Sequence, residues 1–185
     1  ENTNIELGGR LGLFEDWLQL QGAVFQMTKE NSKLFDVNGD LLDTSGDSQE
    51  IAGVEIGLAG AVTEQWSLNA NITWLDAETT FSETPANVGN QIVYTPETAA
   101  SLWTTYNFTG ALSGLEIGGG VTYQDDVFLN ADNTSVAPGY TSLGAFACPP
   151  LHGNVRRAIC FRSTNWLNPI GHGRLHAAPD FSGTL

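Results

Sequence analysis

The sequence predicts an all-β fold, an antiparallel up-and-down meander of long strands. Several runs alternate apolar and polar side chains, which is the period-two pattern of a strand with one apolar face. Tight turns and long polar loops join these runs in alternation, and no stretch has the apolar spacing of a helix. Together these observations predict strands that run up and down beside one another.

The clearest predicted hairpin lies at residues 53–74. In its second run the apolar side chains of Trp66, Leu68, Ala70, Ile72 and Trp74 alternate with polar ones. The first run, residues 53–62, alternates in the same way, and residues 63–65 alone separate the two. Two alternating runs joined by so short a segment are typical of a β-hairpin.

Two further hairpins have the same form. Residues 5–13 and 17–28 flank a turn at residues 14–16, and residues 100–108 and 115–124 flank residues 109–114. Longer connections rich in Asp, Asn, Ser, Thr, Gly and Pro fall between the hairpins, at about residues 29–48, 78–95 and 127–138. We therefore expect about seven strands, with an eighth as an open alternative. Tight turns should lie at one end of the sheet and long loops at the other.

The strand lengths and the two faces favour a fragment of a large transmembrane barrel. The predicted strands have about 9 to 13 residues, and barrel strands need about 9 to 11 residues to cross a bilayer. Trp66, Trp74 and Tyr123 lie near strand ends, where an aromatic girdle would sit. The polar face suits a water-filled lumen, with Ser67, Asn69, Asn71, Thr73, Glu116, Thr122 and Gln124. The alternative is a soluble barrel or sandwich whose apolar face is its core.

Composition and charge narrow the choice of partners. The chain has 185 residues, with 21 acidic and 7 basic side chains and a net charge of −14. This charge argues against nucleic acid as a partner, because phosphate binding needs clustered Lys and Arg. Cations or cationic partners suit the chain better. Charged residues make up 15% of the chain, whereas a soluble surface carries roughly 25% or more. No apolar run is long enough for a transmembrane helix.

Several motifs occur in the order found in one family. Gly53, Glu55 and Gly57 form a Gly-x-Glu-x-Gly pattern, and Trp-Leu-Asp follows at residues 74–76. Residues 96–106, 115–126 and 137–147 continue the order. The sequence thereby resembles the C-terminal barrel half of the TonB-dependent siderophore receptors, most like those for catecholate compounds. The resemblance covers residues 1–147.

The resemblance implies a segment of a roughly 22-stranded, plugged barrel of the bacterial outer membrane that takes up ferric siderophores. It implies three partners: a ferric siderophore bound by the full-length parent, the TonB complex reached through an N-terminal part, and outer-membrane lipid. Residues 5–13 would run downward from the outer surface, so we expect the interior and end of a larger barrel. No family motif assigns ligand-binding positions within this segment, and no cofactor is implied.

The pattern changes after residue 147. Residues 148–185 hold both cysteines, all three histidines and four of the seven basic residues. Residues 148–164 contain two prolines and no sustained alternation, so no strand is expected and the segment is interpreted as divergent or frame-disturbed. Residues 165–185 resemble the family's last extracellular loop and the first part of its final strand.

The acidic stretch at residues 35–50 has the spacing of a calcium loop. Asp36, Asn38, Asp40, Thr44 and Asp47 stand at positions one, three, five, nine and twelve. An EF-hand loop needs Gly at position six and a bidentate Glu at position twelve, with a helix on each side. Position six is Leu41 and position twelve is Asp47. We therefore expect a surface loop and no calcium site.

The other residues of metal-ligand type are Cys148, His152, Cys160, His172 and His176. Their spacing fits no compact zinc finger or ribbon, so no zinc site is predicted. A disulfide between Cys148 and Cys160 is the better interpretation in an oxidising compartment. The sequence has no Gly-x-Ser-x-Gly elbow and reveals no paired carboxylates, so no catalytic residue is predicted.

Three classes of function follow. The strand and loop rhythm and the resemblance favour a receptor and transporter segment that is not an enzyme. A soluble calcium- or carbohydrate-binding β-sandwich module is favoured by low hydropathy and the acidic loop. A hydrolytic outer-membrane barrel would need an outward-facing Ser/His pair near one rim, and none is apparent.

Overall fold

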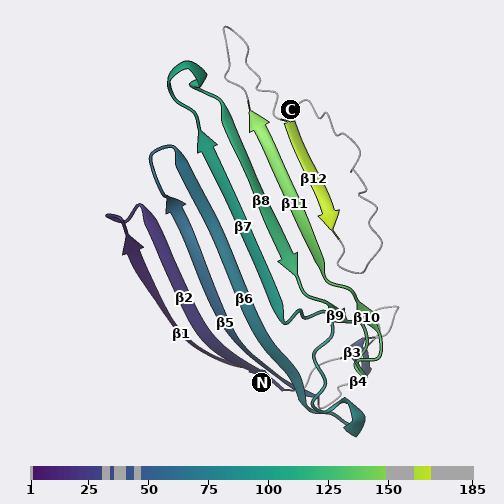
Figure 1. Cartoon of the computed structure of the whole chain (residues 1–185). Helices are drawn as coiled ribbons and strands as arrows, with labels where there is room; N and C mark the ends of the chain where they lie inside the picture. Colours follow the sequence, from purple (N-terminus) through teal and green to yellow (C-terminus); the bar gives the residue numbers. More distant parts are fainter. Residues whose placement is uncertain (1, 31–33, 36–40, 44–46, 149–160, 168–185) are drawn as a thin grey trace.

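Eight long strands form one antiparallel sheet in the computed structural model (Figure 1). The structure describes residues 2–30, 34–35, 41–43, 47–148 and 161–167, with side chains for all of these except 34–35, 41–43 and 161–167. The strand order is β1-β2-β5-β6-β7-β8-β11-β12, so each long strand lies beside the next one in the chain. This is the predicted up-and-down meander, and the eighth strand is present.

The long strands are β1 (Asn2–Leu13), β2 (Leu18–Lys29), β5 (Ser48–Ala61), β6 (Trp66–Phe81), β7 (Thr98–Asn107), β8 (Glu116–Gln124), β11 (Tyr140–Cys148) and β12 (Phe161–Leu167). Two small hairpins pair β3 (Leu34–Phe35) with β4 (Leu41–Asp43) and β9 (Val127–Phe128) with β10 (Val136–Ala137). Two 3-10 helices, η1 (Pro85–Asn87) and η2 (Gly110–Leu112), complete the described elements. Within the described part of the chain, no helix is long and apolar enough to span a membrane.

The connections separate to the two ends of the sheet, as predicted. Figure 1 shows the links β1–β2, β5–β6 and β7–β8 at one end, which we call the turn end. The small hairpins β3–β4 and β9–β10 lie at the opposite end, which we call the loop end.

Strand register divides the side chains into an apolar and a polar face. One cross-strand row consists of Leu11, Leu20, Leu58, Ala70, Leu102, Val121 and Leu143. A nearby row on the other face consists of Arg10, Gln21, Gly57, Asn71, Ser101, Thr122 and Ser142. Because successive side chains of a strand point to opposite faces, the predicted alternation becomes two chemically distinct surfaces.

None of the residues that the structure describes forms a second layer against the apolar face. Among the described residues, Leu18 and Ala77 are the only buried hydrophobic ones, and Leu102 and Leu143 are 41% and 42% exposed. A β-sandwich buries such a face against another sheet, whereas the small hairpins here have two strands each and lie at the loop end. The sandwich alternative is therefore not supported.

Strand β6 is longer than the alternation predicts. The sequence places a loop from about residue 78, but β6 continues to Phe81. Residues 89–92 fold back beside this extension, where the Thr79 N–H donates to the Asn90 carbonyl (2.9 Å) and the Ile92 N–H donates to the Ala77 carbonyl (3.0 Å). Main-chain hydrogen bonds hold this part of β6 extended, and they do not depend on alternation of side chains.

Strand β12 corrects a prediction for the end of the chain. It pairs with β11 from Phe161 opposite Ala147 to Leu167 opposite Thr141. Residues 161–164 are therefore a strand, in a segment for which the sequence predicts none, and residues 165–167 are a strand where a loop is predicted. The main chain of β11 offers N–H and C=O groups to any neighbour that lacks proline, whatever its side-chain pattern. The boundaries at residues 147 and 164 stay predictions.

Candidate functional site

The polar face carries a shallow hollow of about 750 Å³ across strands β1, β2, β5 and β6. Its charged and polar lining side chains are Glu6, Arg10, Gln21, Glu55, Asn71 and Thr73. Glu55 is the middle residue of the Gly-x-Glu-x-Gly motif, and the two glycines of that motif share its face. Two carboxylates and one guanidinium in a wide polar hollow can hold a hydrated or hydrogen-bonding partner. These side chains do not point toward one common point, as catalytic side chains do in an enclosed pocket.

Side-chain hydrogen bonds extend this polar surface from β6 to β7. The Asn71 amide donates to the Ser101 hydroxyl at 3.1 Å, and the Ser67 and Thr105 hydroxyls are hydrogen-bonded to each other. Cross-strand polar pairs of this kind stabilise a wet sheet face by fractions of a kcal/mol each, roughly 0.2–1. The predicted lumen residues Ser67, Asn71 and Thr73 therefore do share one face.

Next to the polar hollow, the same face has an aromatic patch that the alternation does not predict. Trp103 of β7 and Phe146 of β11 stack with ring centroids 5.9 Å apart and planes at 7°. They meet across β8, where Gly118 and Gly120 face the same side. A side chain at either glycine would fall on these rings. The run of three glycines in β8 is the sequence signal that marks such a close approach.

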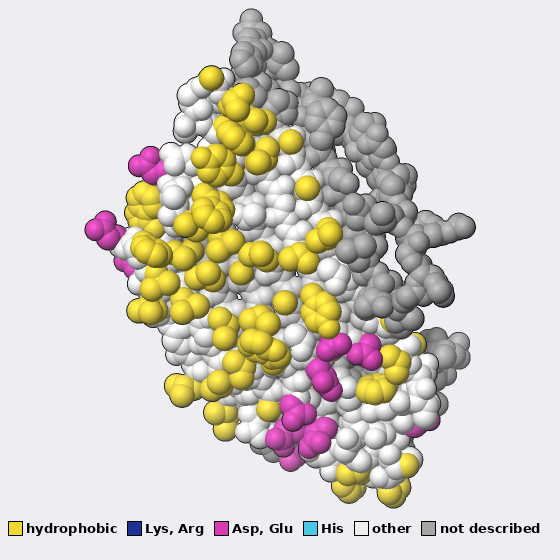
Figure 2. Space-filling view, viewed as in Figure 1, with side chains coloured by type: hydrophobic (Ala, Val, Ile, Leu, Met, Phe, Trp, Pro, Cys, Tyr) yellow, Lys and Arg dark blue, Asp and Glu magenta, His cyan; other side chains and the backbone are white. Residues whose placement is uncertain are grey.

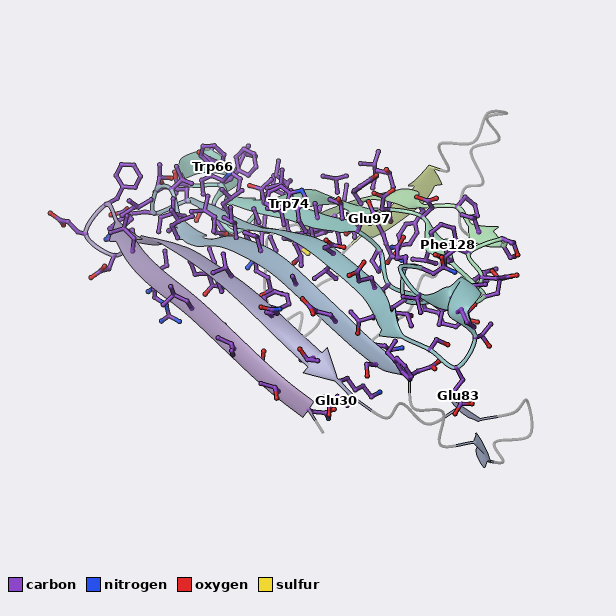
Figure 3. All side chains as sticks on the ribbon, turned by 90° about the horizontal axis from the view of Figure 1, so that it is seen from below. Glu30, Trp66, Trp74, Glu83, Glu97 and Phe128 are labelled. Carbon is purple, nitrogen blue, oxygen red and sulfur yellow. The ribbon has the colours of Figure 1, made fainter. Side chains whose placement is uncertain are left out.

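The apolar face has aromatic residues at both ends of its band, as predicted. Figure 3 shows Trp66 and Trp74 of β6 on the same side of the curved sheet. They are eight residues apart in one strand, which spans roughly 26 Å. Because barrel strands tilt by roughly 35–45° from the membrane normal, this length covers roughly 20 Å of an apolar band that is ~25 Å tall. The Trp66 indole N–H donates to the Thr104 hydroxyl at 2.6 Å, so this ring is fixed at the turn end.

Acidic side chains lie beyond the apolar band toward the loop end (Figure 2). Glu50 of β5 stands opposite Glu78 of β6, and Asp76 stands opposite Ala52 on the same face. The Glu50 carboxylate accepts a hydrogen bond of 2.6 Å from the Gln26 amide. Carboxylates are unfavourable in a hydrocarbon layer, so their position marks where the lipid-facing band ends.

The predicted metal-ligand candidates lie mostly outside the described residues. Four of the five residues with the spacing of a calcium loop lie outside the described residues, namely Asp36, Asn38, Asp40 and Thr44. The fifth, Asp47, accepts a hydrogen bond of 3.3 Å from the Glu83 N–H. The described elements before and after this stretch are strands β3 and β5, not helices, and β4 lies within it. Over the ranges that the structure describes, no group of three or more His, Cys, Asp or Glu side chains could hold a metal ion.

The second candidate set also lies largely outside the described residues. His152, Cys160, His172 and His176 belong to that part of the chain. Cys148 is the last residue of β11 and is disulfide-bonded. Its pairing with Cys160 stays a prediction.

Comparison with known proteins identifies the family of the chain. Residues 1–148 match the family model described as TonB dependent receptor-like, beta-barrel. The match spans well over half of the chain, so the chain belongs to the TonB-dependent receptor β-barrel family. The open sheet is accordingly a fragment of a bacterial outer-membrane β-barrel, with the apolar face outward and the polar face toward the lumen.

Three relatives illustrate the match. The probable TonB-dependent siderophore receptor PiuA of Acinetobacter baumannii is 30% identical over 165 residues, covering 84% of this chain and 22% of PiuA. The ferrichrome outer membrane transporter/phage receptor of Escherichia coli K12 is 33% identical over 125 residues, covering 67% of this chain and 16% of the transporter. The catecholate siderophore receptor Fiu of Escherichia coli K12 is 27% identical over 162 residues, covering 87% of this chain and 20% of Fiu.

The likeness extends to three dimensions. The crystal structure of PiuA from Acinetobacter baumannii matches this chain with a TM-score of 0.70 at 27% identity, over 89% of this chain and 24% of that structure. The chain thus spans less than a quarter of the length of each of these relatives.

Proposed function

We propose that this chain is the barrel segment of a receptor that takes up ferric siderophores across the outer membrane and is energised through the TonB complex. Its membership of the TonB-dependent receptor family carries the proposal. Two of the three relatives are named as siderophore receptors, and the third is named as a ferrichrome transporter.

The two faces support a transport role in different ways. The polar face, with its hollow lined by Glu6, Arg10 and Glu55, forms a wall along which a hydrated chelate can pass. The apolar face holds the segment in lipid through its rows of leucine, valine and tryptophan. TonB would act through an N-terminal part of the full-length receptor, as the resemblance implies.

Transport without chemistry on the cargo is the second part of the proposal. The polar hollow is open, and its carboxylates Glu6 and Glu55 lie in a wide surface with no nucleophile and base paired among the described residues that line it. We therefore propose that the segment guides its cargo and is not an enzyme, in keeping with its membership of a receptor family.

The cargo class we propose is a ferric catecholate, on the sequence resemblance and the likeness to Fiu. Ferrichrome is the competing cargo, because the ferrichrome transporter matches part of the chain at 33% identity. The calcium- or carbohydrate-binding sandwich has no supporting observation in the single open sheet.

Binding can be tested with the full-length receptor purified in detergent. Quenching of its tryptophan fluorescence is measured during titration with a ferric catecholate chelate, with ferrichrome, and with the iron-free form of each as a control. We expect saturable quenching by the ferric catecholate at concentrations at least tenfold lower than those needed for its iron-free form, a difference of about 1.4 kcal/mol. Quenching by ferrichrome alone would change the cargo class, and no quenching by either would contradict the proposal.

A further inference from the structure

The two long loops on either side of β7 and β8 are joined to each other by hydrogen bonds. Loop 82–97 connects β6 to β7, and loop 125–139 connects β8 to β11. The Tyr94 N–H donates to the Phe128 carbonyl at 2.9 Å, and the Asn90 side-chain amide donates to the Ala131 carbonyl at 2.8 Å. Contacts far apart in sequence thus join segments that could otherwise move separately.

Asn133 provides the most complete of these contacts. Its Oδ1 accepts a hydrogen bond of 2.7 Å from the Gln91 N–H, and its Nδ2 donates to the Gln91 carbonyl at 3.0 Å. The same Nδ2 lies 3.3 Å from the Asn130 carbonyl of its own loop. One side-chain amide therefore pairs with both main-chain groups of Gln91, as a neighbouring strand residue would.

Loop 82–97 is in turn fixed to the sheet. The Gly89 N–H donates to the Thr79 carbonyl at 2.8 Å, and the Thr79 N–H donates to the Asn90 carbonyl at 2.9 Å. Ala77, Thr79 and Ser82 are three of the five buried residues in the described part of the chain, with 4%, 9% and 8% exposure. The largest group of buried residues in the described chain thus lies at the loop end of β6 and just beyond it.

Backbone conformation also indicates that the junction is held in place. Asn133 and Tyr94 have φ angles of 52° and 58°, in the left-handed region. Asn tolerates this region through its short polar side chain, whereas for Tyr it costs roughly 1–2 kcal/mol. Residues keep such conformations where the surrounding contacts determine them.

We propose that loops 82–97 and 125–139 form one rigid cap anchored on β6, and that Asn133 is the clasp that joins them. The cap then responds to any partner as a single body, and neither loop opens as a separate lid. Nothing in this inference depends on which chelate the receptor carries.

Hydrogen–deuterium exchange of the full-length receptor in membrane vesicles tests the clasp. Asn133→Gly keeps the left-handed backbone accessible and removes the amide that bonds Gln91. We expect residues 89–94 to exchange about tenfold faster in this variant, which is the effect of losing hydrogen bonds of ordinary net strength. Exchange in strands β7 and β8 should not change, which also reports that the variant is folded.

Asn130→Ala is the matched control, because the Asn130 side chain bonds only within its own loop among the described contacts. Its Oδ1 accepts from the Ser135 N–H at 2.9 Å, and its Nδ2 donates to the Thr134 hydroxyl at 2.8 Å. This variant should accelerate exchange in residues 127–137 and leave residues 89–94 as in the parent protein. Unchanged exchange at residues 89–94 in Asn133→Gly, or equal acceleration there in both variants, would overturn the proposal.

A second variant keeps the test decisive if Asn133→Gly assembles poorly. Asn133→Asp retains an oxygen acceptor for the Gln91 N–H but cannot donate to the Gln91 carbonyl. It should give faster exchange than the parent protein at residues 89–94, by a smaller factor than Asn133→Gly. Exchange as slow as in the parent protein would contradict the role of the amide.

Discussion

Trp103 and Phe146 stack across an intervening strand on the lumen-facing side of the sheet. Their ring centroids are 5.9 Å apart and their planes are nearly parallel, at 7°. The side chains belong to β7 and β11, and the glycines of β8 leave the space in which the rings meet. The contact therefore ties three strands together through one pair of residues.

The stack should appear as coupling between the two rings. We predict a coupling energy of about 0.5–1.5 kcal/mol in a double-mutant cycle of Trp103→Leu and Phe146→Leu. Urea unfolding of the full-length receptor, refolded into lipid vesicles, supplies the four free energies of unfolding. A parallel cycle with Trp74→Leu in place of Trp103→Leu is the control, because Trp74 lies on the opposite face and should be additive with Phe146. Additivity in both cycles would refute the interaction.

The glycine at residue 120 should not tolerate a side chain. A methyl group there would meet the Leu102 carbonyl oxygen and the Trp103 ring, and the main-chain atom cannot rotate away. We predict that Gly120→Ala lowers the free energy of unfolding by about 1–3 kcal/mol through overpacking. Gly9→Ala is the control, since a methyl group at Gly9 has no atom within 4 Å. Equal stability of the two variants would show that the close approach is not maintained in the membrane.

A charged side chain should lower the free energy of unfolding on the outward face much more than on the lumen face. Leu102 lies in the middle of the apolar row, between Ala70 and Val121. We predict that Leu102→Arg lowers the free energy of unfolding in vesicles by roughly 2–4 kcal/mol, the cost of an arginine at mid-bilayer depth. Thr73→Arg, on the lumen face beside the polar hollow, should change it by less than about 1 kcal/mol. A reversed order would mean that the faces are assigned the wrong way round.

The turn between β1 and β2 carries strain that glycine should relieve. Phe14, Glu15 and Asp16 have φ angles of 52°, 57° and 67°, which is unfavourable for residues with a Cβ atom. We predict that Glu15→Gly leaves stability unchanged or raises it by up to about 1 kcal/mol, although glycine gains entropy in the unfolded chain. Glu64→Gly, in the turn between β5 and β6 where no positive φ occurs, should be destabilising by about 0.5–1 kcal/mol. Thermal unfolding of the two variants side by side decides this, and a loss of stability in both would argue against strain at Glu15.

Most of the sheet could be predicted from local pattern. The alternation around Trp66 to Trp74 fixes which side chains share a face, and the tight turn at residues 63–65 fixes the neighbour of that strand. The extension of β6 to Phe81 and the pairing of β12 could not be predicted this way. Both depend on main-chain hydrogen bonds to a partner that side-chain pattern does not reveal, namely residues 89–92 and the edge of β11.

The candidate site was less accessible to prediction than the sheet. Glu55, Asn71 and Thr73 have the expected face, but their meeting with Glu6 and Arg10 in one hollow depends on the register across four strands. Trp103 and Phe146 are aromatic residues at positions where alternation predicts polar ones, so pattern alone misses their contact. The bond between Asn133 and Gln91 joins residues 42 positions apart, and no local signal indicates it.

The sequence by itself determined the strands, their two faces and the alternation of turns and loops, because these follow from side-chain period and turn chemistry within a few residues. Tertiary structure alone decided where the loops meet, which glycines make room for aromatic rings, and where the largest group of buried residues lies. Such contacts depend on the relative positions of distant segments, and those positions are fixed only when the register of every strand between them is set.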